Sequence, residues 1–171
     1  MPSSGPRSAT SATSTVRYPE SVLRWLLRIW RRLPGPVRFA YLRVRYTRYA
    51  VGVAALIRDE RGRILIVHRT YSIEEPWALP GGWLEGRETL VHTLERELLE
   101  ETGLHIRVGA PVAVERGHFA LVVLLAAELV AGNSLVGFQP SDEVNELAWL
   151  EPSEVLARLS PFNALLLRRA L

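Results

Sequence analysis

The stretch from Gly82 to Leu104 constrains the fold of this chain more than any other part of its sequence. It reads GWLEGRETLVHTLERELLEETGL, and its segment Glu88–Thr102 predicts a helix that ends at Gly103. At about 100° per residue, three acidic side chains of this helix share an arc of about 100°. They are Glu97, Glu100 and Glu101. An apolar stripe of Val91, Leu94 and Leu98 lies beside that arc, so we expect the carboxylates at the edge of a buried face.

A helix face of this kind is suited to holding a divalent cation. Neighbouring glutamates on a helix repel each other in water by roughly 0.2–0.5 kcal/mol per pair. A hard cation turns this repulsion into binding, because Mg²⁺ and Mn²⁺ prefer carboxylate oxygens as ligands. With phosphate oxygens in its shell, the cation can neutralise a diphosphate and activate a water molecule. Taken alone, the acidic face could equally be an ordinary solvated surface.

The spacing of these residues resembles the Nudix box of the MutT-like Nudix hydrolase family. That pattern is Gly, five residues, Glu, seven residues, then Arg-Glu-aliphatic-any-Glu-Glu-any-Gly-aliphatic. The chain matches it at Gly82, Glu88, Arg96, Glu97, Leu98, Glu100, Glu101, Gly103 and Leu104. By average residue usage, such a match arises by chance at fewer than roughly one in 10⁸ start sites. The chain departs from the family at Arg87, where Gly is usual.

The resemblance implies a role for each matched residue. The three clustered glutamates are the expected metal ligands, often joined by the backbone carbonyl at Gly82, and the expected metal is Mg²⁺, with Mn²⁺ as an alternative. Arg96 is expected to orient the carboxylates, and Glu88 to hold Arg96. Glu97 and Glu100 are the candidates for the general base that activates the attacking water.

Candidate site residues outside the box are weaker. Glu143, in a loop, is either an additional metal ligand or base or a solvated acid, and Glu115 is a lesser candidate. Arg69, at the end of a strand, could contact a substrate phosphate. Trp83 and Tyr71 could stack on a base or ring, or simply pack. The four histidines have no metal-ligand spacing and are expected to be structural or exposed: His68, His92, His105 and His118.

The resemblance implies hydrolysis of a phosphoanhydride bond in a nucleoside diphosphate linked to another group. Two alternatives stay open at this stage. One is a pyrophosphohydrolase acting on nucleoside triphosphates or RNA 5′ ends, and the other is a Nudix module that binds a ligand without cleaving it. The intact set of Arg96 and the three glutamates favours an enzyme over the binding module.

The apolar patterns predict an α+β fold, an α-β-α sandwich in which helices flank a mixed sheet, over residues 49–171. Strands are expected at Ala50–Ile57 and Arg63–Arg69, joined as a hairpin by the turn DERG, with a loop at Trp77–Gly82. Later strands are expected at 104–115, 119–130 and 147–150, and helices at 153–159 and 161–171.

The N-terminal region has a different composition. Residues 1–50 hold ten Arg and one Glu, whereas residues 51–171 hold eleven Arg and 17 acidic residues. Residues 1–19, rich in Ser, Thr and Pro, are expected to be disordered. Residues 20–48 predict a basic amphipathic helical extension, in which 37–48 is either a second helix or an irregular connection. This extension could lie on a membrane surface, dock on the remaining chain or form a homodimer, whereas nucleic-acid binding is less expected.

Composition limits the cellular setting only loosely. The chain has no Cys, which excludes disulfides, thiolate metal sites and a cysteine nucleophile. No apolar run approaches the roughly 20 residues of a membrane span. We expect a cytoplasmic protein, with attachment to the inner membrane surface through residues 20–48 as an open alternative. All 21 basic residues are Arg, a bias that favours GC-rich coding and a bacterial source.

Overall fold

The computed structural model describes residues 19–46, 48–132 and 135–171, and the tail expected to be disordered lies almost wholly outside these ranges. The chain divides into two compact units, Met1–Thr47 and Arg48–Leu171, called here the N-terminal unit and the body. No helix among the described residues is both long enough and apolar enough to cross a membrane.

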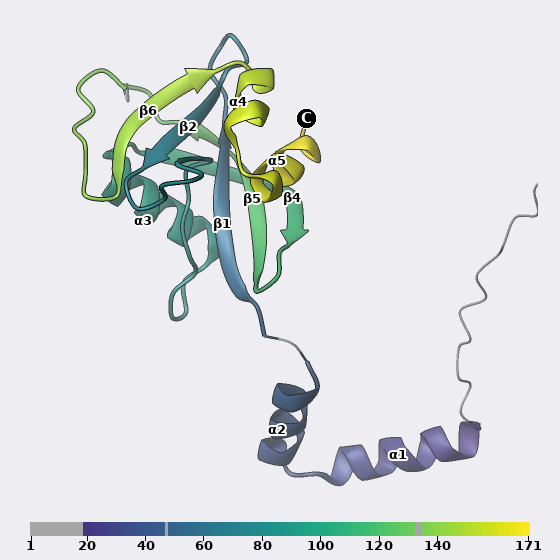
Figure 1. Cartoon of the computed structure of the whole chain (residues 1–171). Coiled ribbons are helices and arrows are strands. Elements are labelled where there is room, and N and C mark those ends of the chain that lie inside the picture. The colour runs from purple at the N-terminus through teal and green to yellow at the C-terminus, as the bar shows by residue number, and fades with distance from the viewer. Residues whose placement is uncertain (1–18, 47, 133–134) are drawn as a thin grey trace, which may run out of the picture. The chain divides into compact units, whose positions relative to one another are not determined.

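The described residues of the N-terminal unit form two helices, α1 (Glu20–Arg32) and α2 (Gly35–Arg45) (Figure 1). Pro34, which lacks a backbone N–H, separates them, and α2 begins directly after it. The segment that the sequence left undecided is therefore a helix as far as Arg45. The rings of Trp30 and Tyr41 meet edge to face with centroids 5.3 Å apart, so the two helices contact each other.

The body contains two three-stranded sheets. In the first, β1 (Ala50–Ile57) pairs in parallel with β5 (Ala120–Leu129), which pairs antiparallel with β4 (Ile106–Arg116). In the second, β2 (Ile64–Arg69) lies antiparallel between β3 (Trp77–Ala78) and β6 (Val144–Leu150). The mixed sheet confirms the α+β fold class.

The predicted turn between the first two strands forms, with one antiparallel bridge between Arg58 and Ile64, but the pairing does not continue along the strands. The DERG turn does form, because the Gly62 N–H donates to the Asp59 carbonyl at 2.9 Å, but β1 and β2 then enter different sheets. The reason is that both edges of β1 have other partners. One edge pairs with β5, and the other pairs with the LPGG segment, where the Ala55 N–H donates to the Pro80 carbonyl at 2.8 Å. The segment predicted as a loop from Trp77 also begins with the short strand β3.

Three helices cover the body, and each begins or ends at a residue suited to that position. The longest, α3 (Leu90–Thr102), starts at Thr89, whose side chain accepts a hydrogen bond from the His92 N–H at 3.2 Å. It ends at Gly103, in the left-handed conformation with φ 69°. The two shorter helices are α4 (Pro152–Arg158) and α5 (Pro161–Arg168), and each carries proline in its first turn.

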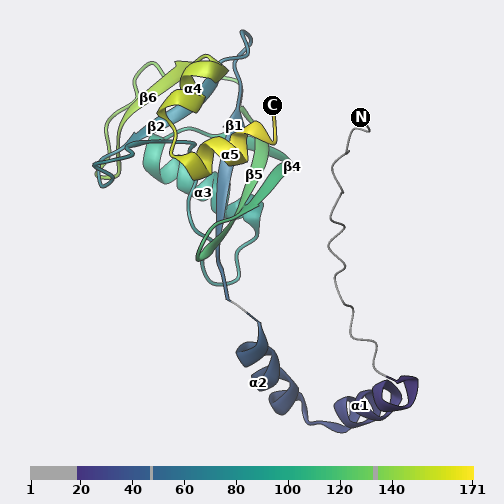
Figure 2. The same cartoon turned by 45° about the vertical axis from the view of Figure 1, so that its right-hand side comes forward.

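Strand β1 is buried on both faces, and its alternate residues enter two separate clusters. Val53, Ala55 and Ile57 pack with Leu94 and Leu98 of α3. The intervening Ala54 and Leu56 pack with residues of α4 and α5 on the opposite side. Helix α3 therefore covers one side of β1, with α4 and α5 on the other (Figures 1 and 2). Val91, expected in the buried stripe of α3, is 40% exposed because it lies in the first turn, beyond the sheet.

Candidate active site

The guanidinium of Arg96 holds three carboxylates. Its Nε and Nη2 donate to the two oxygens of Glu88 at 3.1 and 3.2 Å. Nη2 also donates to Glu97 at 3.1 Å, and Nη1 donates to Glu100 at 3.0 Å. These ion pairs raise the pKa of Arg96 above its ordinary value and lower that of Glu88. Arg96 therefore lies between Glu88 and two glutamates of α3, and the roles predicted for Arg96 and Glu88 stay predictions.

Glu101 lies deeper in the body than the other glutamates of α3. Glu101 is only 7% exposed. Its Oε2 atom is buried and has no hydrogen-bond partner among the described residues. Burial raises the pKa of Glu101 to about 7, and the negative charges of Glu97 and Glu143 add to this effect while Arg69 opposes it. Burial also raises the pKa of Glu97.

Two glycines set the distance between the LPGG segment, β1 and α3. A Cβ at Gly82 would lie 2.2 Å from the Glu97 side chain, so only glycine leaves room for that carboxylate. At Gly81, φ is +152° and a Cβ would lie 2.1 Å from the Val53 carbonyl oxygen. Two backbone hydrogen bonds join Gly82 to Val53, with N···O distances of 3.1 and 2.9 Å. These bonds fix the Gly82 backbone, whose Cα faces the Glu97 side chain.

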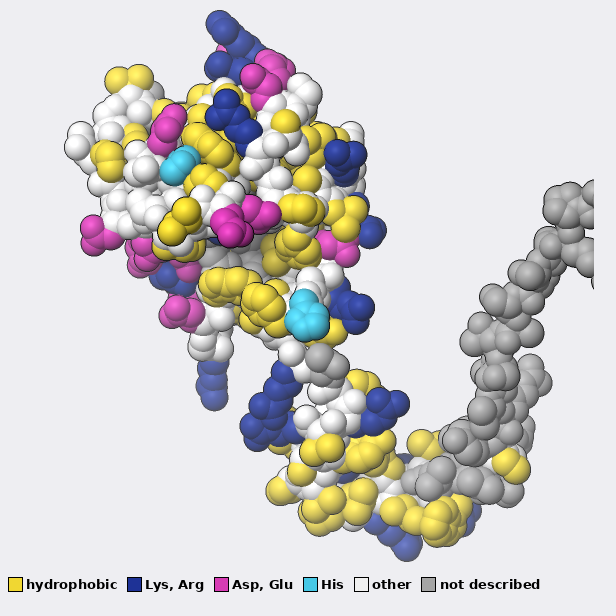
Figure 3. All heavy atoms as spheres, viewed as in Figure 1, with side chains coloured by type: hydrophobic (Ala, Val, Ile, Leu, Met, Phe, Trp, Pro, Cys, Tyr) yellow, Lys and Arg dark blue, Asp and Glu magenta, His cyan; other side chains and the backbone are white. Residues whose placement is uncertain are grey.

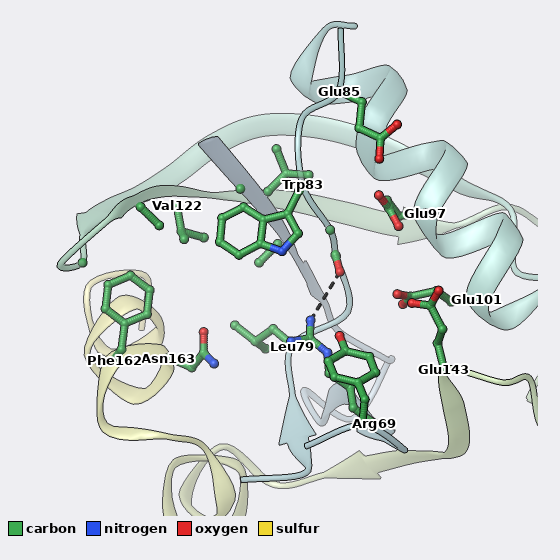
Figure 4. Close-up of a pocket in the computed structure, with 18 of the residues that line it drawn as sticks. Arg69, Leu79, Trp83, Glu85, Glu97, Glu101, Val122, Glu143, Phe162 and Asn163 are labelled. Carbon is green, nitrogen blue, oxygen red and sulfur yellow. Dashed lines mark hydrogen bonds between the residues drawn. The ribbon is translucent and has the colours of Figure 1, made fainter. Parts of the chain in front are cut away.

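These residues line a cleft of about 660 Å³ with two chemically different ends (Figure 4). The acidic end holds Glu97, Glu100 and Glu101 of α3 and, facing them, Glu143. The other end is aromatic and is lined by Trp83, Phe119 and Phe162, with Asn163 beside them. The Trp83 and Phe119 ring centroids are 6.3 Å apart with an angle of 32° between the rings.

Arg69 and Tyr71 lie in the same cleft, so the three substrate-binding candidates from the sequence come together there. The Arg69 Nη2 donates to the Gly81 carbonyl at 3.3 Å, and its Cζ lies 5.8 Å from the centroid of the Tyr71 ring. Trp83 is 48% exposed and Tyr71 60% exposed, so both rings offer free surface to a ligand.

Glu115 does not line the cleft. It forms an ion pair with Arg169, with Nε and Oε2 2.6 Å apart, and we assign it a structural role. His92 is exposed and His68 packs edge to face on Trp77, as expected for residues without a catalytic role. His118, however, lies on the cleft wall.

The sequence did not predict several cleft residues. Phe119 and His118 lie in the turn between β4 and β5, whereas Phe162 and Asn163 belong to the first turn of α5. None stands in a motif, and only the folded chain brings α5 against the β4–β5 turn, where a Cβ at Gly117 would lie 3.3 Å from the Phe162 ring. The available sequence signal for a ligand-binding residue was an aromatic side chain, Phe119, in a short turn between two strands. Phe119 is 67% exposed.

Comparisons with known proteins identify the family. The model of the NUDIX domain matches residues 48–170. This chain belongs to the Nudix family. It is 32% identical over 123 residues to a MutT-like protein of Streptomyces ambofaciens, covering 72% of this chain and 77% of that protein. It is 34% identical over 113 residues to the phosphatase NudJ of Escherichia coli K12, covering 62% of this chain and 71% of NudJ.

A solved structure agrees with this assignment. The solution structure of the E. coli ORF135 protein matches with a TM-score of 0.57 and 28% identity, covering 72% of this chain and 89% of that one. Together, the named Nudix hydrolases among the relatives support the assignment of the body as a pyrophosphohydrolase. Enzymes of this family generally use a divalent metal and act on small nucleotide derivatives.

The acidic end of the cleft has the chemistry such a metal needs. The donor atoms are all oxygens, the buried Glu101 Oε2 lacks a partner, and Gly82 leaves space beside Glu97. Among the described residues, no three acidic or histidine side chains are gathered closely enough to share one ion as they stand. In this arrangement Glu97 and Glu100 both accept hydrogen bonds from Arg96. The all-oxygen donor set and the unpartnered Oε2 of Glu101 therefore fit a divalent cation.

Proposed function

We propose that this Nudix enzyme hydrolyses a phosphoanhydride bond in a nucleoside diphosphate linked to another group, with Mg²⁺, or Mn²⁺ in its place. The observation that carries the proposal is the two-ended cleft. Its acidic end suits a metal-bound diphosphate, and its aromatic end suits a planar base. A cleft of about 660 Å³ is of the size that binds a ligand of nucleotide dimensions.

The metal would be held by Glu97, Glu100 and Glu101 of α3, with Glu143 and the Gly82 carbonyl as further oxygen ligands. When bound there, Mg²⁺ would supply charge neutralisation on the diphosphate and a more acidic water. Arg96 would keep two of these carboxylates oriented through its hydrogen bonds, and Glu88 would hold Arg96 through two more.

The reaction we propose is the attack of water on one phosphorus of the diphosphate. The new P–O bond forms as the bridging P–O bond breaks, and the other phosphate group leaves with the bonding electrons. Glu97 or Glu100 would accept the proton of the attacking water, because both carboxylates line the cleft at its acidic end. Two phosphorylated products result.

We propose that Arg69 contacts a phosphate oxygen and that Trp83 and Tyr71 bind the ring system of the substrate. The Arg69 guanidinium lies between the Gly81 carbonyl and the Tyr71 ring, on the cleft wall. Phe119 and Phe162 extend the aromatic end, and the Asn163 amide supplies both a donor and an acceptor for the edge of a base.

We place this activity in the cytoplasm, where the N-terminal unit would hold the enzyme at a membrane surface.

The activity test is a screen of nucleoside diphosphate sugars, dinucleoside polyphosphates and nucleoside triphosphates with Mg²⁺ and with EDTA. Reaction in ¹⁸O-labelled water identifies the attacked phosphorus from the labelled product. Turnover that does not depend on a divalent cation would contradict the proposed site.

Two variants of α3 test the role of the carboxylates. Glu100→Gln removes a charge from the acidic end, and we expect kcat to fall about 10²–10³-fold because transition-state charge is less well neutralised. Glu95→Gln is the matched control, since Glu95 is exposed on the same helix and does not line the cleft. Ligand binding with unchanged turnover in Glu100→Gln would refute the proposed catalytic role.

A further inference from the structure

The N-terminal unit exposes an unusually large amount of apolar and aromatic surface for its size. Nine large side chains of this kind are between 40% and 90% exposed. They are Trp25, Leu27 and Ile29 on α1, and Val37, Phe39, Tyr41, Leu42, Val44 and Tyr46 on α2 and the residue after it. Figure 3 shows hydrophobic side chains gathered over both helices, with Arg side chains at their margins. We call this set of residues the apolar face.

The charge beside the apolar face is almost entirely positive. Residues 20–48 hold eight Arg and one Glu. On α1 the four Arg, at 24, 28, 31 and 32, fall within an arc of about 100°, and apolar residues occupy the remainder of the helix. A helix with an Arg arc and a wider arc of Trp, Leu and Ile is suited to lying in the plane of a lipid interface.

Arginine and aromatic side chains are interleaved on α2. The Arg43 Cζ lies 5.5 Å from the centroid of the Phe39 ring, and the Arg45 Cζ lies 5.9 Å from that of Tyr46. These contacts place the cationic groups at the border of the apolar face, with their aliphatic stems along it. Cations at that level meet headgroup phosphates when the rings enter the boundary between headgroups and acyl chains.

We propose that residues 20–48 bind an anionic membrane surface, lying on it rather than crossing it. Helices of 13 and 11 residues are about 20 and 17 Å long, shorter than a hydrocarbon core of about 30 Å. A membrane supplies both a continuous anionic layer for the Arg arc and an apolar layer for the apolar face. The acidic body of a second copy supplies charge, but it buries the branched side chains of β1 and β2 in its own core.

The test uses the full chain and sedimentation with vesicles of phosphatidylcholine alone or with a quarter phosphatidylglycerol. We expect binding to the anionic vesicles that weakens with added salt, since exposed charges are screened. The triple variant Arg28→Gln, Arg31→Gln, Arg32→Gln should bind about 100-fold more weakly, because each basic residue at such a surface contributes about fivefold. The control, with the same change in net charge, is Arg58→Gln, Arg61→Gln, Arg107→Gln, all on exposed residues of the body.

A second measurement tests the apolar face directly. Brominated lipids should quench the fluorescence of Trp25 and Trp30, and the variant Trp25→Phe, Trp30→Phe should lose that quenching while keeping hydrolysis of soluble substrates. Equal loss of vesicle binding in both Arg triple variants would overturn the proposal, because it would show a net-charge effect. The proposal would also be overturned if the unchanged chain did not bind anionic vesicles, and a changed oligomeric state in the first triple variant would then point to a second copy as the partner. RNA binding as tight as vesicle binding would overturn it as well.

Discussion

Arg96 and Glu88 are joined by two side-chain hydrogen bonds, from Nε to Oε1 at 3.1 Å and from Nη2 to Oε2 at 3.2 Å. The same guanidinium, which lies on the cleft wall, donates to Glu97 and Glu100, so the pair orients two proposed metal ligands. Glu88 is in turn held by the Thr93 hydroxyl at 3.0 Å. The position of the acidic end therefore depends on a residue in the loop before α3.

Replacing Arg96 by Lys tests this dependence. Lysine keeps the charge but cannot form the planar set of hydrogen bonds, so we expect kcat with Mg²⁺ to fall by about 10–100-fold. The control is Arg107→Lys, at an exposed position of β4. Steady-state kinetics and Mg²⁺ titration measure both effects. Unchanged kcat and unchanged Mg²⁺ affinity in Arg96→Lys would show that Arg96 does not position the carboxylates.

The buried Glu101 predicts how the stability of the metal-free enzyme depends on pH. Burial raises the pKa of Glu101 from 4.5 to about 7 in the folded state, so between these values the folded chain binds more protons than the unfolded chain. Its contribution to stability is therefore full below about pH 4.5 and is lost as pH rises through about 7. Mg²⁺ should restore stability above that pH by binding the ionised carboxylate.

Urea unfolding in EDTA between pH 5 and 8.5 measures this dependence. Glu101→Gln should flatten the slope, because the amide does not titrate, and Glu95→Gln should leave it unchanged. An equally steep slope in Glu101→Gln would assign the pH dependence to other groups.

The two adjacent glycines should respond differently to the same substitution. Gly81→Ala places a methyl group against the Val53 backbone, which cannot move without disturbing β1, and we expect a loss of about 1–3 kcal/mol or more in unfolding free energy. Gly82→Ala meets the movable end of the Glu97 side chain, so stability should fall by less than about 1 kcal/mol. Activity should fall at least about tenfold, because Glu97 is displaced. Denaturation and kinetics on both variants separate the effects, and equal destabilisation by the two would contradict the geometry.

Replacing Trp83 should change the affinity for substrate rather than the rate of the chemical step. If its ring stacks on the base, Trp83→Ala should raise KM roughly tenfold with little change in kcat, since one stacked base contributes about 1–3 kcal/mol. Trp25→Ala, in the N-terminal unit, should leave KM for a soluble substrate unchanged. A loss confined to kcat would indicate that Trp83 acts on the reacting phosphates instead.

The acidic end was largely predictable because its residues are close in sequence. Helix periodicity alone brings Glu97, Glu100 and Glu101 onto one arc, and their spacing to Arg96 and Glu88 carries the family pattern. The loop residue Glu143 was named only as a candidate, and the structure places it opposite Glu101.

The aromatic end was only partly predictable because its residues are distant in sequence. Trp83 could be named from its place in the box, whereas Phe119 and Phe162 carry no local pattern. The separation of β1 and β2 into different sheets was unpredictable for the same reason. The DERG turn is a local signal and was correct, but the partners of β1 depend on the parallel pairing with β5, some 70 residues away.

The short segment Glu85–Arg87 is exposed and lies between two fixed points. Before it, the Leu84 N–H donates to the Val51 carbonyl at 2.8 Å, and after it Glu88 is clamped by Arg96. The side chains at positions 85 and 87 can therefore change without moving the carboxylates, whereas Gly86, with φ +53°, favours glycine. Glu85 lies on the cleft wall. Changes at positions 85 and 87 can therefore alter selectivity among related nucleotides while Glu97, Glu100 and Arg96 keep their positions.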